Sequence, residues 1–136
     1  MSETTEKQQD KFVEQVKKDV KIDIYDIVGD SRDVPNNLQK YSDMLRSESH
    51  KMNTIKVKMD EIYHEQFIFY TRDHPLKFNP SDARKLTETD PRMIKARKLF
   101  NEASENVEYL RNVMWNLREK TKSISNIIQM KKIELS

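Results

Sequence analysis

Apolar residues with a seven-residue period occupy the last third of the chain. Between Met93 and Ile128 they recur at alternating spacings of three and four over five heptads. This pattern predicts a long α-helix that buries one narrow stripe against other helices, and it indicates assembly rather than an active-site cleft. The positions of the seam are Met93, Ala96, Phe100, Ala103, Val107, Leu110, Met114, Leu117, Thr121, Ile124 and Ile128.

Few residues in this chain interrupt a helix. One glycine and four prolines among 136 residues favour long helices over a sheet, which would need many turns. With 35% hydrophobic and 35% charged residues, a domain of this size builds only a thin core unless chains associate. We therefore expect an all-α, self-associating protein, with a long two-helix coiled-coil hairpin preceded by a small N-terminal helix.

Residues 1–36 are expected to hold a short helix and a connector. Apolar side chains share one face over residues 4–19, which predicts a helix. The following segment mixes β-branched residues with Gly29 and Pro35, so a connector is expected there rather than a continued helix. Residues 37–136 then form the helical hairpin of a single domain.

A second helix is expected from residue 37 to about residue 70. Its apolar residues also follow a heptad pattern, which Glu48 and Gln66 interrupt. The two seams predict that the second and last helices pack as an antiparallel hairpin. The seam positions of the second helix are Leu38, Tyr41, Leu45, Met52, Ile55, Met59, Ile62 and Phe69.

Prolines separate the two long helices. Pro75 and Pro80 mark a break, which a short helical turn over residues 81–86 is expected to follow. Asp90 is a natural N-cap residue with Pro91 at the first helical position, and this pair predicts the start of the last helix.

The chain lacks the residue patterns that catalysis or metal binding requires. Its single glycine, Gly29, excludes glycine-rich phosphate loops, and the absence of cysteine removes thiolate nucleophiles and zinc–thiolate sites. His50, His64 and His74 stand too far apart for a two-histidine metal site on a helix. We therefore expect no enzyme activity, no cofactor and no metal.

Nothing in the sequence indicates a membrane. The N-terminal residues are polar and include acids, unlike a signal or transit peptide. The longest apolar run, residues 67–70, is far too short to span a bilayer. Because the chain has no cysteine to oxidise, a reducing cytoplasm is the expected location.

Basic residues flank both seams. In the e and g positions of the heptads, nine residues are basic and two, Glu65 and Glu134, are acidic. Cations repeated along a rigid helix repel one another unless a polyanion lies along them, and a phosphate backbone is the obvious candidate. A solvated rim that keeps a coiled coil soluble is the alternative. The basic residues are Lys51, Lys56, Lys58, Arg72, Arg97, Arg111, Arg118, Lys120 and Lys132.

The seam of the last helix is wider than that of a simple coiled coil. Leu99, Val113 and Ile127 make its g positions largely apolar, which suits packing against more than one helix, as in a bundle or a ring. Seam residues toward the C-terminus are therefore the candidates for oligomerisation. They are Val107, Leu110, Met114, Leu117, Ile124 and Ile128.

Aromatic residues gather beside Arg72 at the end of the second helix. Tyr63, Phe67 and Phe69-Tyr70 could stack on unpaired bases, but their helical spacing near a break favours a role in covering the end of the hairpin. Trp115 is expected to point outward, where it could mark a contact between subunits.

Three segments resemble one protein family. The stretch Ile55-Lys56-Val57-Lys58-Met59-Asp60 resembles the apolar-Lys-x-basic-apolar-Asp motif in the central helix of the UvsY family of phage recombination mediators. KKDVKID near the N-terminus and ISNIIQMKKIE near the C-terminus are similar to segments of that family in order and spacing. These matches cover most of the chain after residue 15, whereas residues 67–90 match poorly.

The resemblance implies a non-enzymatic recombination mediator. Such a protein binds single-stranded DNA, removes or weakens the single-strand-binding protein and loads a RecA-like phage recombinase, in the cytoplasm of a phage-infected bacterium. It also implies that the last helix drives assembly of a ring-like homo-oligomer, a hexamer or heptamer. The alternative from the residues alone is a structural coiled-coil adaptor that binds an acidic protein partner and has no DNA role.

The resemblance assigns DNA contacts to two lysines. The basic residues of the family motif map to Lys56 and Lys58. At Lys58 the family has arginine, so a bidentate phosphate contact is lost here while the positive charge remains. Flanking cations of the seams extend the candidate nucleic-acid surface of the hairpin. They are Lys51, Arg72, Arg97 and Arg111.

Overall fold

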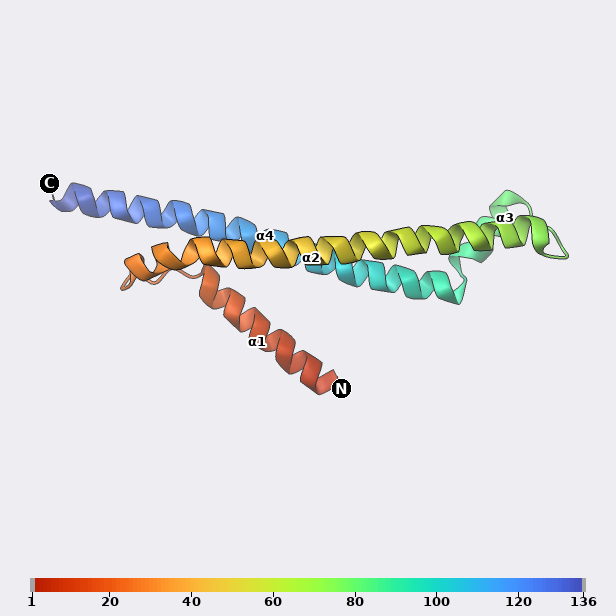
Figure 1. The fold of residues 1–136 in the computed structure, drawn as a ribbon, viewed down its shortest axis with the longest axis horizontal. Helices are drawn as coiled ribbons and strands as arrows, with labels where there is room; N and C mark the ends of the chain where they lie inside the picture. The colour runs from red at the N-terminus through yellow and green to blue at the C-terminus, as the bar shows by residue number, and fades with distance from the viewer. Residues whose placement is uncertain (1, 136) are drawn as a thin grey trace. The chain divides into compact units, whose positions relative to one another are not determined.

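The computed structural model describes the backbone of residues 2–135 and the side chains of residues 3–135. Helices make up the fold, and no strand occurs in the described part, as the all-α prediction required (Figure 1). No helix in this part is long and apolar enough to cross a lipid bilayer. The elements are α1 (Ser2–Val20), α2 (Ile27–Ile68), the π-helical turn η1 (Phe69–Asp73), α3 (Pro80–Glu88) and α4 (Pro91–Leu135).

Two compact units make up the chain, and both long helices contribute to each of them. The first unit contains the residues up to Leu45 and those from Tyr109 onward. The second contains Arg46–Glu108.

In the first unit, α1 packs on the first part of α2 and the last part of α4. Val16, Tyr41 and Leu117 are buried in one cluster with further apolar residues of all three helices. Val34 and Ile124 meet in a second cluster, so higher numbers in α2 pair with lower numbers in α4. The two helices are therefore antiparallel within this unit, as the hairpin prediction required.

Helix α2 begins at Ile27, so the prediction of a connector up to residue 36 is wrong. The connector is restricted to residues 21–26. Asp26 caps the helix, because its Oδ1 atom accepts a hydrogen bond from the Gly29 N–H at 3.0 Å. Because Gly29 has no side chain, it leaves room for the Asp26 carboxylate, with which a Cβ at this position would collide.

Pro35 lies inside α2 without ending it. Proline removes one backbone hydrogen bond, which would be formed with the carbonyl of Ser31. Ser31 is exposed, so water can satisfy that carbonyl. Val34 and Ile27 are buried against the last part of α4, and this packing keeps the segment helical despite the proline.

The second unit contains the rest of α2, η1, α3 and the first part of α4. Asn79 caps α3, since its Oδ1 atom accepts from the Asp82 N–H at 2.9 Å, and Pro80 occupies the first helical turn. Helix α3 is thus slightly longer than the predicted turn over residues 81–86. Asp90 caps α4 as predicted, because its Oδ1 atom accepts from the Arg92 N–H at 2.9 Å.

Most positions of the predicted seam in α4 are buried, which confirms the register. The exceptions are Thr121 and Ile128, which are exposed, and Phe100 and Met114, which are partly buried. The buried members are Met93, Ala96, Ala103, Val107, Leu110, Leu117 and Ile124.

Candidate nucleic-acid interface

The predicted DNA-binding side chains are all exposed. Arg111 lies in the first unit, and the other five lie in the second. Of the latter, Lys51, Lys56 and Lys58 belong to α2, Arg72 to η1 and Arg97 to α4.

Lys56 and Lys58, the motif lysines, face opposite flanks of the α2 seam. Two residues apart on an α-helix, their side chains point about 200° apart. Within residues 3–135 neither ammonium group lies in a salt bridge, whereas Lys51 approaches the Glu48 carboxylate at 3.9 Å. The motif therefore offers two unpaired cations, but not on one surface of the helix.

Lys58 lines a groove of about 310 Å³ between α2 and α4 in the second unit. We call this the Lys58 groove. Cationic side chains from both helices border it, and apolar side chains form its floor. The cations are Lys58, Arg92 and Lys95, and the floor residues are Ile55, Ile62, Ala96 and Leu99.

Arg92 and Lys95 were not among the predicted site residues. Arg92 occupies the g position one heptad before Leu99, so extending that row upstream would have found it. Lys95 occupies a c position, away from the seam, and only the packing of α4 beside α2 places it at the groove.

The side chain of Arg92 is held in place by its neighbours. Its Nε atom lies 3.8 Å from Asp90 Oδ1. With the Gln66 amide oriented to satisfy both of its polar atoms, the amide nitrogen donates to Asp90 Oδ2 at 3.3 Å and the oxygen accepts from Arg92. Gln66, which interrupts the heptad seam of α2, thus links the start of α4 to α2.

Lys120 is buried, so its assignment to an exposed cationic row is wrong. Only 4% of the residue is exposed. Its Nζ atom donates to the Asp19 carbonyl oxygen at 2.8 Å and lies 3.5 Å from Asp30 Oδ1. Lys120 therefore joins α4 to the end of α1 and the start of α2, and it is unavailable to DNA.

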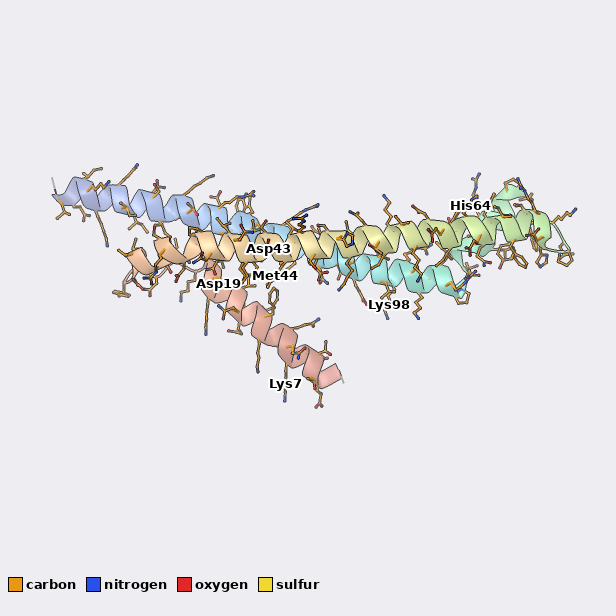
Figure 2. All side chains as sticks on the ribbon, in the orientation of Figure 1. Lys7, Asp19, Asp43, Met44, His64 and Lys98 are labelled. Atoms are coloured by element: carbon orange, nitrogen blue, oxygen red, sulfur yellow. The ribbon has the colours of Figure 1, made fainter. Side chains whose placement is uncertain are left out.

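The Asp19 carboxylate, whose residue is labelled in Figure 2, accepts three hydrogen bonds in the first unit. Tyr41 Oη donates to it at 2.6 Å, Lys40 Nζ at 2.9 Å and Gln15 Nε2 at 2.9 Å. Burial acts to raise the pKa of Asp19, but these hydrogen bonds and the charge of Lys40 outweigh burial and hold the pKa below its ordinary value. Burial, and then the bond to Asp19, raise the pKa of Tyr41.

The candidate oligomerisation residues are mostly buried within one chain. Leu110 and Leu117 belong to the cluster around Tyr41, and Met114 packs against it. Val107 and Ile124 are also buried, whereas Ile128 is 36% exposed. Their role in contacts between subunits stays a prediction, and the side chains of residues 128–135 are all exposed in this chain.

Aromatic side chains of the second unit pack mainly on one another. The rings of Tyr63 and Phe67 are stacked with centroids 6.3 Å apart. Tyr70 and His74 each contact Phe78, at 6.1 and 5.0 Å between centroids. This packing favours the interpretation that they cover the end of the hairpin. Trp115 is 60% exposed, as its outward position required.

No group of three His, Asp or Glu side chains that could hold a metal ion occurs among the described residues.

Comparison with known proteins identifies the family. A family model described as the recombination, repair and single-stranded-DNA-binding protein UvsY matches residues 15–135. The chain belongs to the UvsY family. No curated protein matches it by sequence.

Two crystal structures of the UvsY recombination mediator of bacteriophage T4 resemble this fold. The lattice type II structure has a TM-score of 0.82 at 15% identity, covering 93% of this chain and 97% of that chain. The type IV structure has a TM-score of 0.80 at 16% identity, covering 93% and 98%. The UvsY fold is thus retained although few residues are identical.

Proposed function

We propose that this UvsY-family chain is a recombination mediator that binds single-stranded DNA as a homo-oligomer. It would promote loading of a RecA-like recombinase onto DNA that a single-strand-binding protein covers. The family is described by recombination, repair and single-stranded DNA binding, and the similar T4 protein is a recombination mediator. These descriptions support the general role, and the cations of the second unit support the DNA contact.

The observation that carries this proposal is the state of the two motif lysines. Lys56 and Lys58 are exposed and in no salt bridge within the described residues, although the chain holds nearly as many acids as bases. Unpaired cations at fixed positions on a helix are suited to phosphates, which neutralise them and release counterions. Such contacts are independent of base sequence.

Assembly would convert modest sites into tight binding. A subunit that contributes a few phosphate contacts binds weakly, but linked copies engage one strand at a high effective concentration. A ring-like hexamer or heptamer would let the strand pass from one subunit to the next. This assembly is part of the proposal.

The test is a titration of a fluorescent oligothymidine with the protein at several salt concentrations. Log affinity should fall with log salt by about 0.7 for each phosphate contact. Lys56→Ala with Lys58→Ala should weaken binding and lower this slope without changing the mass of the native particle. Lys7→Ala with Lys11→Ala is the matched control, because both lysines are exposed on α1.

Two outcomes would contradict the proposal. One is binding that does not depend on salt, and the other is a clear preference for duplex over single strands. Tight, salt-sensitive binding to an acidic protein with no affinity for the oligonucleotide would instead support the coiled-coil adaptor. Recombinase loading is measured separately, by strand exchange on DNA covered with single-strand-binding protein.

A further inference from the structure

The Lys58 groove combines three cations with an apolar floor. Lys58 comes from α2, whereas Arg92 and Lys95 come from the start of α4. Of the floor residues, Leu99 is 45% exposed. An exposed apolar surface bordered by cations is typical of a binding site rather than of a solvated helix face or a closed core.

The charges of the groove are only partly balanced by the protein. Asp90 approaches Arg92 at 3.8 Å, but neither Lys58 nor Lys95 forms a salt bridge within residues 3–135. Cations that line the same groove repel one another, and an anion bound there reduces that repulsion.

The start of α4 adds to this imbalance. Its first turn contains no acid, and Arg92, Lys95, Arg97 and Lys98 follow within eight residues of Pro91 (Figure 2 labels Lys98). Of these cations, Arg92 lies in the first turn, where the positive end of the helix dipole disfavours a cation and the Asp90 cap offsets part of this cost. A bound phosphate would offset this cost, because it interacts favourably with both the cations and the dipole.

We propose that the Lys58 groove is a subsite for single-stranded DNA. Arg92 and Lys95 hold phosphates together with Lys58, and Leu99 and its apolar neighbours receive the sugars and base edges between them. The subsite rests on the proposed function and adds two residues that the family motif does not contain. It also separates the motif lysines, because Lys58 acts within the groove and Lys56 does not.

Loss of a phosphate contact and loss of an apolar contact affect the salt dependence of binding differently. Arg92→Gln with Lys95→Gln removes two phosphate contacts per subunit, so the salt slope should fall by about 1.4 for each subunit that the strand engages. If the affinities converge near about 1 M salt, each engaged subunit accounts for about 25-fold weaker binding at about 0.1 M. Leu99→Gln should weaken binding with the slope unchanged, because apolar contacts release no counterions.

Arg84→Gln with Lys85→Gln is the matched control. These residues are exposed on α3 in the same unit, and the variant loses the same arginine and lysine charges. Its affinity and slope should equal those of the wild type. Arg92→Lys with Lys95→Arg keeps the charges and should retain the wild-type slope. Thermal unfolding of each variant checks that the fold is intact.

The outcomes separate this subsite from the function on which it rests. If the wild type fails to bind the oligonucleotide, the proposed function fails. If the wild type binds and the Lys56/Lys58 variant binds weakly, but the Arg92/Lys95 variant equals the wild type, only the subsite is overturned. Equal losses in the Arg92/Lys95 and Arg84/Lys85 variants would also overturn it, since they would reflect net charge alone.

Discussion

A buried lysine illustrates how single residues hold the first unit together. Removing one member of a buried ion pair typically costs about 3 kcal/mol, because the other member stays buried without a partner. Lys120→Ala leaves the Asp19 carbonyl without this donor and the partly buried Asp30 carboxylate without its cation, although Asp30 keeps the hydrogen bond from the Asp23 N–H. We therefore expect the free energy of unfolding to fall by about 3 kcal/mol, as measured by urea denaturation.

Lys122→Ala is the control for Lys120→Ala. Lys122 lies two residues further along α4 and pairs with Glu119 at 3.1 Å, but its side chain is 72% exposed. Exposed pairs of this kind contribute about 0.5 kcal/mol or less. A similar loss of stability in both variants would contradict the structural role of Lys120.

The Asp19 carboxylate should make the free energy of unfolding depend on pH. Its pKa is lowered in the folded state, so its contribution is present above the unfolded pKa of about 3.9 and is lost as the pH falls through the folded pKa. Asp19→Asn keeps an acceptor for Tyr41 but removes the charge near Lys40. In urea denaturation from pH 7 to 2.5, the wild type should have a higher free energy of unfolding than Asp19→Asn at neutral pH. This difference should shrink below about pH 4.

Asp43→Asn controls for the loss of one carboxylate. Asp43 is exposed on α2, and Gln39 donates a hydrogen bond to it. This variant should follow the wild-type pH profile. If the free energies of unfolding of the wild type and Asp19→Asn differ by the same amount at every pH, the charge of Asp19 does not contribute to stability.

Among the elements, α4 was predictable from the sequence and the start of α2 was not. Both signals at α4, the Asp90 cap and the heptad seam, are local and agree with each other. At the start of α2, Gly29 and Pro35 oppose a helix locally, whereas Ile27 and Val34 continue the seam. Burial against α4 makes this segment helical. Local sequence propensity cannot predict this, because the contacting residues lie far apart in the sequence.

Val34→Ala tests whether this packing holds the start of α2 in place. Val34 is 4% exposed and lies in the cluster with Ile27 and Ile124. Removing two buried methyl groups should lower the free energy of unfolding by about 2 kcal/mol. Val28→Ala, one turn and a half earlier and 80% exposed, should stay within about 0.5 kcal/mol of the wild type. Equal effects would show that residues 27–36 do not pack.

Across the whole molecule, the motif lysines of the candidate site were predictable, and their surroundings were not. Lys56 and Lys58 carry a recognisable pattern of residues. Arg92 and Lys95 join Lys58 only because α4 lies beside α2 in the second unit. Conversely, Lys120 has the heptad position of a surface cation but is enclosed where α1, α2 and α4 meet in the first unit. Tertiary packing thus decides which cations of a helix face solvent.

The same distinction applies to assembly of the proposed homo-oligomer. Leu117 is completely buried in the cluster around Tyr41, so Leu117→Asp places a charge in the core of a single chain and should unfold the first unit. Ile128 is 36% exposed, and Leu135, which continues the same row of the seam one heptad later, is 89% exposed. Ile128→Asp with Leu135→Asp should therefore dissociate the oligomer while the helices remain.

Sedimentation velocity and circular dichroism separate these two effects. The Ile128/Leu135 variant should sediment as a smaller particle with wild-type helicity, and its affinity for single-stranded DNA should fall because avidity is lost. Met130→Asp is the control, since Met130 is 61% exposed but lies off the seam. If the double variant keeps the wild-type mass, the C-terminal seam is not the subunit interface, and exposed apolar residues elsewhere, such as Trp115, must supply it.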